Sequence, residues 1–195
     1  MAMGLPLDLM EASIRRLGYG QILFVLLLFV MAAIRPDVYF GNGGVSEYAL
    51  MPSTAPVFVV AFLSAAASMW VVAGSLPATA TGKGIRFALR LCAALTIGLV
   101  VFPAIGDGFV DHLHIWIAII LFTVESLLVI WLAAGMGRCV VNLGLLAILL
   151  VAALASLLSL YHIVQCKTQA EILFQLSFNL LLTRLLRGKV PPSRC

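Results

Sequence analysis

Residues 112–134 read HLHIWIAIILFTVESLLVIWLAA, and histidines aside, Glu125 is the one ionisable side chain in this stretch. An α-helix needs roughly 20 mostly apolar residues to cross the hydrocarbon core of a bilayer, which is about 30 Å thick. The stretch therefore predicts a transmembrane helix. Glu125 falls near its middle, where a charged side chain costs roughly 2.5–3.5 kcal/mol on insertion scales. We expect Glu125 to face other helices and to have a partner there.

The rest of the chain repeats this apolar character in five further stretches. Of the 195 residues, 63% are apolar and 10% are charged, whereas soluble domains have about 45–50% and about 25%. An ordinary soluble domain is excluded. The sequence predicts an all-α, polytopic membrane protein in which six transmembrane helices form one bundle with short loops. The predicted spans are 17–34, 54–76, 85–105, 112–134, 139–164 and 170–186.

The positions of Lys and Arg predict the orientation of the six spans. Of the twelve basic residues, only Arg35 and Lys167 fall on one side of the predicted membrane. Basic residues mark cytoplasmic loops, so both termini are expected in the cytoplasm. We expect an integral, multi-pass protein of the plasma membrane or of an organelle's inner membrane. The ten residues on the cytoplasmic side are Arg15, Arg16, Lys83, Arg86, Arg90, Arg138, Arg184, Arg187, Lys189 and Arg194.

The two ends of the chain are interpreted separately. Residues 1–16 predict a cytoplasmic amphipathic segment, with Leu7, Met10 and Ile14 on one side of a short helix at the interface. Residues 188–195 form a basic cytoplasmic tail. The first span has an alternative interpretation as a signal peptide, which would leave an odd number of spans and spoil the charge balance.

The sixth span also has an alternative interpretation. Glu171, Gln175, Asn179 and Thr183 recur every four residues and form a polar stripe, so this helix could lie flat at the membrane interface. That arrangement would leave four basic C-terminal residues on the wrong side. Because the positive-inside rule disfavours it, we expect the helix to cross the membrane with its polar stripe facing neighbouring helices.

Arg184 is the predicted partner of Glu125. Counted at 1.5 Å of rise per residue, both lie about 20 Å from the non-cytoplasmic end of their spans. The pair could fix the register of two helices, or Glu125 could serve as a protonatable relay or a counter-charge for a ligand. The alternative for Arg184 is to extend its long side chain to the cytoplasmic surface.

A second polar group is predicted at the non-cytoplasmic ends of the helices. Imidazole and carboxylate are the ligand types that suit zinc and other transition metals, so a metal ion is an alternative here, with Asp111, His114 and His162 as its weak candidate ligands. The His112 and His114 side chains point about 200° apart on a helix and cannot readily hold one ion. The candidate ligand- or lipid-binding residues are Ser46, Glu47, Asp107, Asp111, His112, His114 and His162.

Two short motifs resemble those of the DRAM-type (Frag/Sfk-like) six-helix membrane proteins and the related bacterial membrane family. Residues 44–48, GVSEY, resemble that family's element in the first outer loop, and residues 98–103, GLVVFP, followed by His112 or His114, resemble the end of its third span. The resemblance implies six helices, cytoplasmic termini and a cap built from the first and third outer loops. In such a cap, Ser46 and Glu47 are expected to hydrogen-bond His112 or His114.

The functional expectation is a non-enzymatic integral membrane protein. It would be an accessory subunit of a membrane complex or a lipid-binding regulator, with membrane lipids and other membrane subunits as partners and its polar cluster at the non-cytoplasmic mouth. The alternative is an intramembrane enzyme or transporter acting on a lipid or proton through Glu125 and the outer His/Asp group. No familiar catalytic motif, cofactor or catalytic residue is predicted, and the dispersed basic residues argue against nucleic acid.

Overall fold

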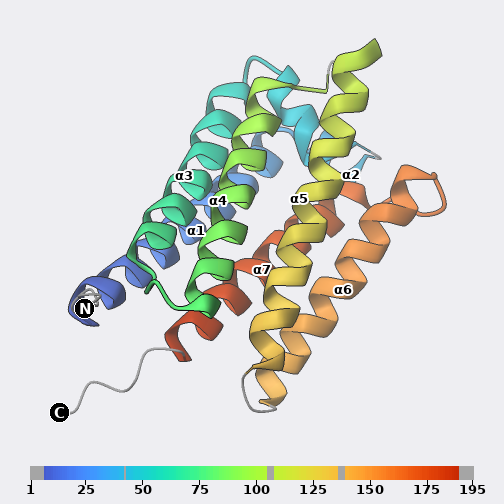
Figure 1. Ribbon diagram of the computed structural model, residues 1–195. Coiled ribbons are helices and arrows are strands. Elements are labelled where there is room, and N and C mark those ends of the chain that lie inside the picture. Colours follow the sequence, from blue (N-terminus) through green and yellow to red (C-terminus); the bar gives the residue numbers. More distant parts are fainter. Residues whose placement is uncertain (1–6, 42, 105–107, 136–138, 189–195) are drawn as a thin grey trace.

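The computed structural model describes residues 7–41, 43–104, 108–135 and 139–188. Every regular element in these ranges is helical, which confirms the all-α prediction. Figure 1 shows the long helices lying side by side as a bundle. The elements are α1 (Leu7–Ile34), α2 (Pro36–Phe40), the 3-10 helix η1 (Val45–Leu50), α3 (Ala55–Ser75), α4 (Ala80–Val101), α5 (Gly108–Ala134), α6 (Val140–Leu160) and α7 (Lys167–Gly188).

Five of the described helices are long and apolar enough to cross a membrane: α1, α3, α4, α5 and α6. The chain is therefore a multi-pass membrane protein. The helix at the predicted sixth span, α7, is not among the five, because polar and charged side chains recur along its length.

Local chemistry explains where the helices begin and end. Arg35 leaves the helical conformation, with φ −131°, because the proline that follows it disfavours a helical residue. Pro103 has the same effect on α4, which ends at Val101 rather than at the predicted residue 105. Gly108 has φ +77°, a left-handed conformation that favours glycine, and it begins α5 ahead of the predicted residue 112.

The N-terminal prediction needs a correction. Residues 7–34 form one continuous helix, so no boundary separates an amphipathic segment ending at residue 16 from a first span. Ile14 is 2% exposed and Met10 packs against the core, which places their side of the helix inside the bundle. No proline interrupts this stretch, so helical hydrogen bonding continues through it. Residues 1–6 and 189–195 lie outside the described residues.

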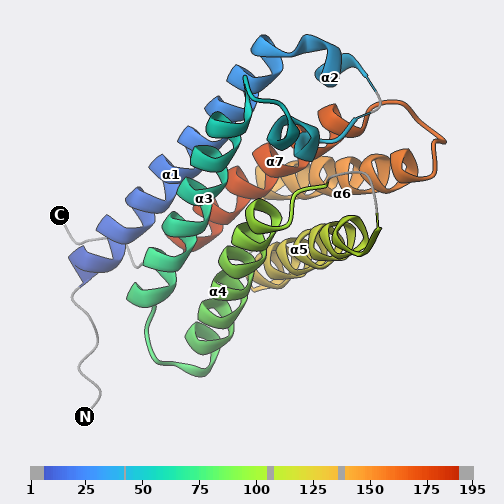
Figure 2. The same cartoon turned by 90° about the horizontal axis from the view of Figure 1, so that it is seen from above.

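Helix α7 occupies the interior of the bundle. Figure 2 shows it between the α1–α3 pair and the α5–α6 pair, and it packs against α1, α5 and α6. Its start lies against α2, the short helix that follows the end of α1, because the Thr168 hydroxyl donates a hydrogen bond to the Val38 carbonyl of α2. A Cβ placed on Gly18, in the first half of α1, would lie 3.7 Å from Thr183, in the second half of α7. α7 therefore runs antiparallel to α1 along the length of the bundle.

The interior position explains how a moderately polar helix is accommodated. Its apolar side chains are among the most buried in the chain: Phe174, Leu181, Leu182 and Leu185 are each 0% exposed. Most of α7 is covered by protein, with Leu173 and Leu180 on its exposed side, so polar side chains on its covered sides can find partners on neighbouring helices instead of facing hydrocarbon.

Candidate functional site

One end of the bundle carries a cover built from the segment between α1 and α3. We call α2 and η1 together the cap. The first residues of α7 hold it: the Glu171 carboxylate accepts a hydrogen bond from the Val45 N–H at 2.6 Å. The Thr168 hydroxyl donates to the Gly43 carbonyl at 2.6 Å, and the Gln169 amide donates to the Tyr39 carbonyl at 2.5 Å. The cap is therefore fastened to the last helix.

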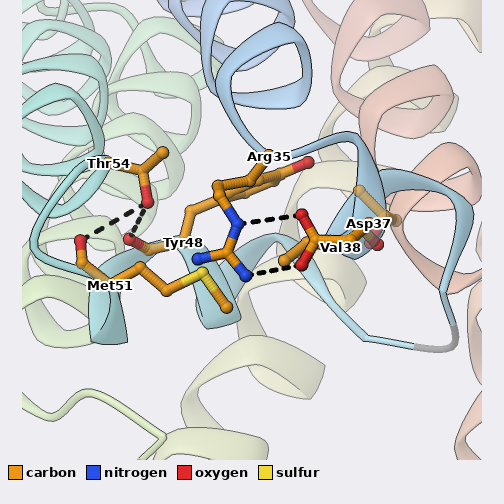
Figure 3. A network of polar contacts seen from close by, with 7 residues as sticks. Arg35, Asp37, Val38, Tyr48, Met51 and Thr54 are labelled. Carbon is orange, nitrogen blue, oxygen red and sulfur yellow. Dashed lines mark hydrogen bonds and ion pairs between the residues drawn. The ribbon is translucent and has the colours of Figure 1, made fainter.

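The cap has its own polar framework, shown in Figure 3. The Arg35 guanidinium donates two hydrogen bonds to the Asp37 carboxylate, at 2.8 and 2.5 Å, and these hold the pKa of Asp37 below its usual value. The Thr54 hydroxyl donates to the Tyr48 carbonyl at 2.7 Å. Tyr48 is 0% exposed, and burial raises the pKa of its phenol to about 12. The buried ring fixes η1 on the bundle.

Four of the predicted site residues line one hollow under the cap. A cavity of about 370 Å³ is bordered by Ser46 and Glu47 from η1 and by Asp111 and His114 from α5. Lys167, at the start of α7, also lines it. We call this space the polar hollow. The structure thus brings together the first-loop and third-loop residues that the sequence analysis grouped, and it adds a cation to them.

The predicted bonds between the loops are replaced by a different contact. The His114 Nδ1 lies 2.6 Å from the Phe102 carbonyl oxygen, so this nitrogen carries the proton and donates it. The carbonyl follows the last turn of α4, where backbone acceptors lack partners within the helix. His114 therefore closes the end of α4, and the hydrogen bond expected from Ser46 or Glu47 is not made. His112 is exposed on another side of α5.

The remaining predicted residues do not join the hollow. His162 lies exposed beyond the end of α6, in a left-handed conformation with φ 56°, and does not line the cavity. Asp107 lies outside the described residues. In the part of the chain that the structure describes, no three His, Cys, Asp or Glu side chains gather closely enough to hold a metal ion. Asp111, His114 and His162 therefore do not form the weak metal site considered from the sequence.

Glu125 is buried, as predicted, but its partner is not Arg184. It is 2% exposed and accepts a hydrogen bond from the Gln175 amide of α7 at 2.9 Å. Arg184 is exposed and donates to the Asn142 side chain at 3.2 Å. Gln175 is eight residues into α7 and Glu125 is seventeen into α5, so α7 begins about 13 Å deeper than α5 at 1.5 Å per residue. This stagger makes the equal-depth estimate wrong.

A second, larger apolar cavity adjoins the polar hollow. It has a volume of about 380 Å³, lies between helices of the bundle, and shares Ser46, His114, Ile115 and Lys167 with the hollow. We call it the apolar cavity. Its polar residues Glu171 and Gln175 belong to α7. Its apolar wall includes Phe24, Leu28, Phe58, Phe62, Phe122 and Leu157.

The apolar cavity reaches the outside of the bundle between α5 and α6. Leu127 of α5 and Leu157 of α6 both line it and are 60% and 46% exposed. In a membrane protein, such side chains face lipid. The cavity therefore has a side that faces hydrocarbon and a wall that it shares with a charged hollow.

The sequence analysis missed two residues of this site. Lys167 lines both spaces and Gln175 connects the apolar cavity to Glu125. The sequence does set Lys167 apart, because it is one of only two basic residues predicted on the non-cytoplasmic side of the membrane. Gln175 belonged to the polar stripe, but its partner lies fifty residues away in the chain.

No match was found among protein-family models, curated proteins or solved structures, so the resemblance to DRAM-type proteins stays a prediction.

Proposed function

We propose that the chain crosses the membrane six times and that the cap faces the non-cytoplasmic side. Support comes from α7, which lies antiparallel to α1 and extends along the bundle. It also comes from the basic residues. Arg35 and Lys167 lie at the cap end, whereas Arg15, Arg16, Lys83, Arg86, Arg184 and Arg187 belong to the opposite halves of their helices and Arg90 lies near the middle of α4. The positive-inside rule then assigns that opposite end to the cytoplasm.

Cysteine labelling tests this orientation. Cys139 is exposed and precedes α6, while Cys166 follows it. The N–H groups of Asn142 and Val141 lower the pKa of the Cys139 thiol, so it should react with maleimide at a lower pH than an ordinary cysteine. In single-cysteine variants, we expect an impermeant maleimide to label Cys139 from the cytoplasmic side and Cys166 from the other side.

A third single-cysteine variant, Arg187→Cys, reports on α7. If α7 crosses the membrane, this thiol is labelled from the same side as Cys139. Labelling from the side that reaches Cys166 would contradict the sixth crossing while leaving the other five in place.

We further propose that the protein is a non-enzymatic, lipid-binding membrane protein, acting as a regulator or as an accessory subunit of a membrane complex. The observation that carries this proposal is the shared wall of the two spaces: an apolar cavity of about 380 Å³ and a hollow lined by charged side chains have Ser46, His114, Ile115 and Lys167 in common. Ligand sites are commonly concave, mostly apolar spaces of this size with a few polar groups. A hydrocarbon chain would enter between α5 and α6, and the head group would lie under the cap.

Narrowing the apolar cavity is the direct test of lipid binding. Ala153 lines the cavity, so Ala153→Phe should displace part of the bound chain. Each methylene moved out of an apolar site costs about 0.8 kcal/mol, and losing two of them lowers affinity about tenfold. We expect about tenfold less phospholipid to be retained after detergent washing, measured by native mass spectrometry.

The matched control is Ala67→Phe, which adds the same ring to an exposed position of α3 that does not line the cavity. It should retain lipid like the unchanged protein. Equal retention by Ala153→Phe and Ala67→Phe, with both proteins folded, would contradict the proposed site.

The alternative, an enzyme or transporter working through Glu125, has less support. Glu125 does not line either of the two cavities, and its carboxylate is already engaged by Gln175. An acid, base or counter-charge needs contact with the reacting group or ligand. Glu125 is better explained as a structural link between α5 and α7.

A further inference from the structure

We propose that the polar hollow selects a phospholipid whose zwitterionic head group ends in a primary ammonium, as in phosphatidylethanolamine. This inference rests on the proposed lipid binding and names the class of lipid bound. It follows from three features of the hollow: the charged side chains that line it, which of these already have a hydrogen-bond or ion-pair partner, and the lack of aromatic side chains among the described lining residues.

Lys167 is the phosphate-binding group in this proposal. It lines both the apolar cavity and the polar hollow, so its ammonium lies where a head group joins its hydrocarbon chains. Glu171 is a neighbouring charge that acts on it, but in the described part of the chain no carboxylate lies within ion-pair distance of it. A Cβ on Gly44 would lie 3.1 Å from the Lys167 Nζ, so glycine at this position lets the ammonium rest against the cap. A lysine ammonium is a common phosphate ligand.

Glu47 and Asp111 are the ammonium-binding groups. Both line the polar hollow, and neither carboxylate has a hydrogen bond or an ion pair with any other residue that the structure describes. Glu171 differs, because it is engaged by the Val45 N–H. Two carboxylates without such a partner therefore line the hollow together with one ammonium, whose nearby charge, Glu171, lies in the wall of the apolar cavity. A purely anionic head group would meet net repulsion there, whereas a zwitterion would pair both signs of charge.

The described residues that line the hollow also favour a primary ammonium over a quaternary ammonium. Quaternary ammonium groups such as choline are recognised by aromatic cages. The described residues that line the polar hollow include no Phe, Tyr or Trp. Carboxylates instead favour a cation that donates N–H hydrogen bonds, which a primary ammonium does and choline does not. Ethanolamine therefore fits this hollow better than choline.

Competition between head groups tests the inference. The delipidated protein would be reconstituted into nanodiscs holding equal amounts of dioleoyl phosphatidylethanolamine, phosphatidylcholine and phosphatidylglycerol, and retained lipid would be identified by native mass spectrometry. We expect the unchanged protein to retain the ethanolamine lipid about tenfold over either competitor, a preference worth about 1.4 kcal/mol. Lys167→Gln should lower retention of all three lipids.

The carboxylates account for the selectivity, so their removal should abolish it. The double variant Glu47→Gln with Asp111→Asn should bind the ethanolamine and choline lipids equally. The matched control is Asp37→Asn, which removes a cap carboxylate that is paired with Arg35 and does not line the hollow. That variant should keep the preference.

The outcomes separate this inference from lipid binding itself. If lipid is retained and Ala153→Phe displaces it, but the three head groups bind equally, the head-group inference is wrong and the proposed function stands. A preference for ethanolamine that persists in the double variant also overturns the inference. If no lipid is retained and Ala153→Phe has no effect, both proposals fail.

Discussion

Replacing Gln175 with leucine is expected to lower the free energy of unfolding by about 1–3 kcal/mol. The substitution removes the amide that donates to Glu125 and leaves a carboxyl group that is 2% exposed without this donor. When a buried polar group loses its partner, no hydrogen bond offsets the free energy of its desolvation. Denaturation by SDS in mild detergent micelles, followed by helical circular dichroism, would measure the change.

A double-mutant cycle distinguishes a structural role of Glu125 from a role that needs its ionisable carboxyl group. The pair Glu125→Leu with Gln175→Leu should recover most of the stability lost in Gln175→Leu, because removing both polar partners leaves none stranded. Glu125→Gln keeps a side chain able to accept from Gln175 and should be nearly neutral. If Glu125→Gln is stable but loses lipid retention or cellular function, an ionisable group is needed there and the structural assignment is wrong.

The helices themselves were readable from the sequence, because lipid imposes a length and a composition on each span. The five apolar helices lie at the predicted positions, and Pro36 and Pro103 act at their ends by restricting the residue before them. Most ends differ from the prediction by five residues or fewer, but α1 begins at Leu7, ten residues before the predicted start of the first span. The stretch 85–105 was extended past Pro103 since its apolar character continued beyond the point where the backbone could stay helical.

The contacts between helices were not readable in the same way. A polar stripe indicates that a helix needs partners but does not identify them, so the predicted pairing of Glu125 with Arg184 rests on depth alone. Depth counted from the span ends assumes that all spans start at one plane, and α7 starts well below α5. The prediction that histidines hold the cap fails for a similar reason. Glu171 and Val45, which form one of the actual attachments, are 126 residues apart in the chain, and no local sequence pattern indicates such a pair.

Removing the Glu171 carboxylate is expected to release the cap. Glu171→Ala leaves the Val45 N–H without its acceptor at 2.6 Å and leaves Lys167 without the nearby charge. A hydrogen bond to a charged group contributes about 1.5–3 kcal/mol, so the free energy of unfolding should fall by about that amount. Glu171→Gln keeps an acceptor oxygen and should lose less. Hydrogen exchange would follow the release locally, as faster exchange of the amides of η1.

Thr168→Val provides the comparison that shows whether the cap moves as one unit. Valine keeps the shape of threonine but cannot donate to the Gly43 carbonyl. Gly43 and Val45 are two residues apart, so both bonds fasten one short segment, and breaking either frees much of what the other holds. We therefore expect the double variant Thr168→Val with Glu171→Ala to lose less stability than the sum of the two single losses. Strict additivity would mean that the two bonds act separately, and the cap would then have to be described as two independent attachments to α7.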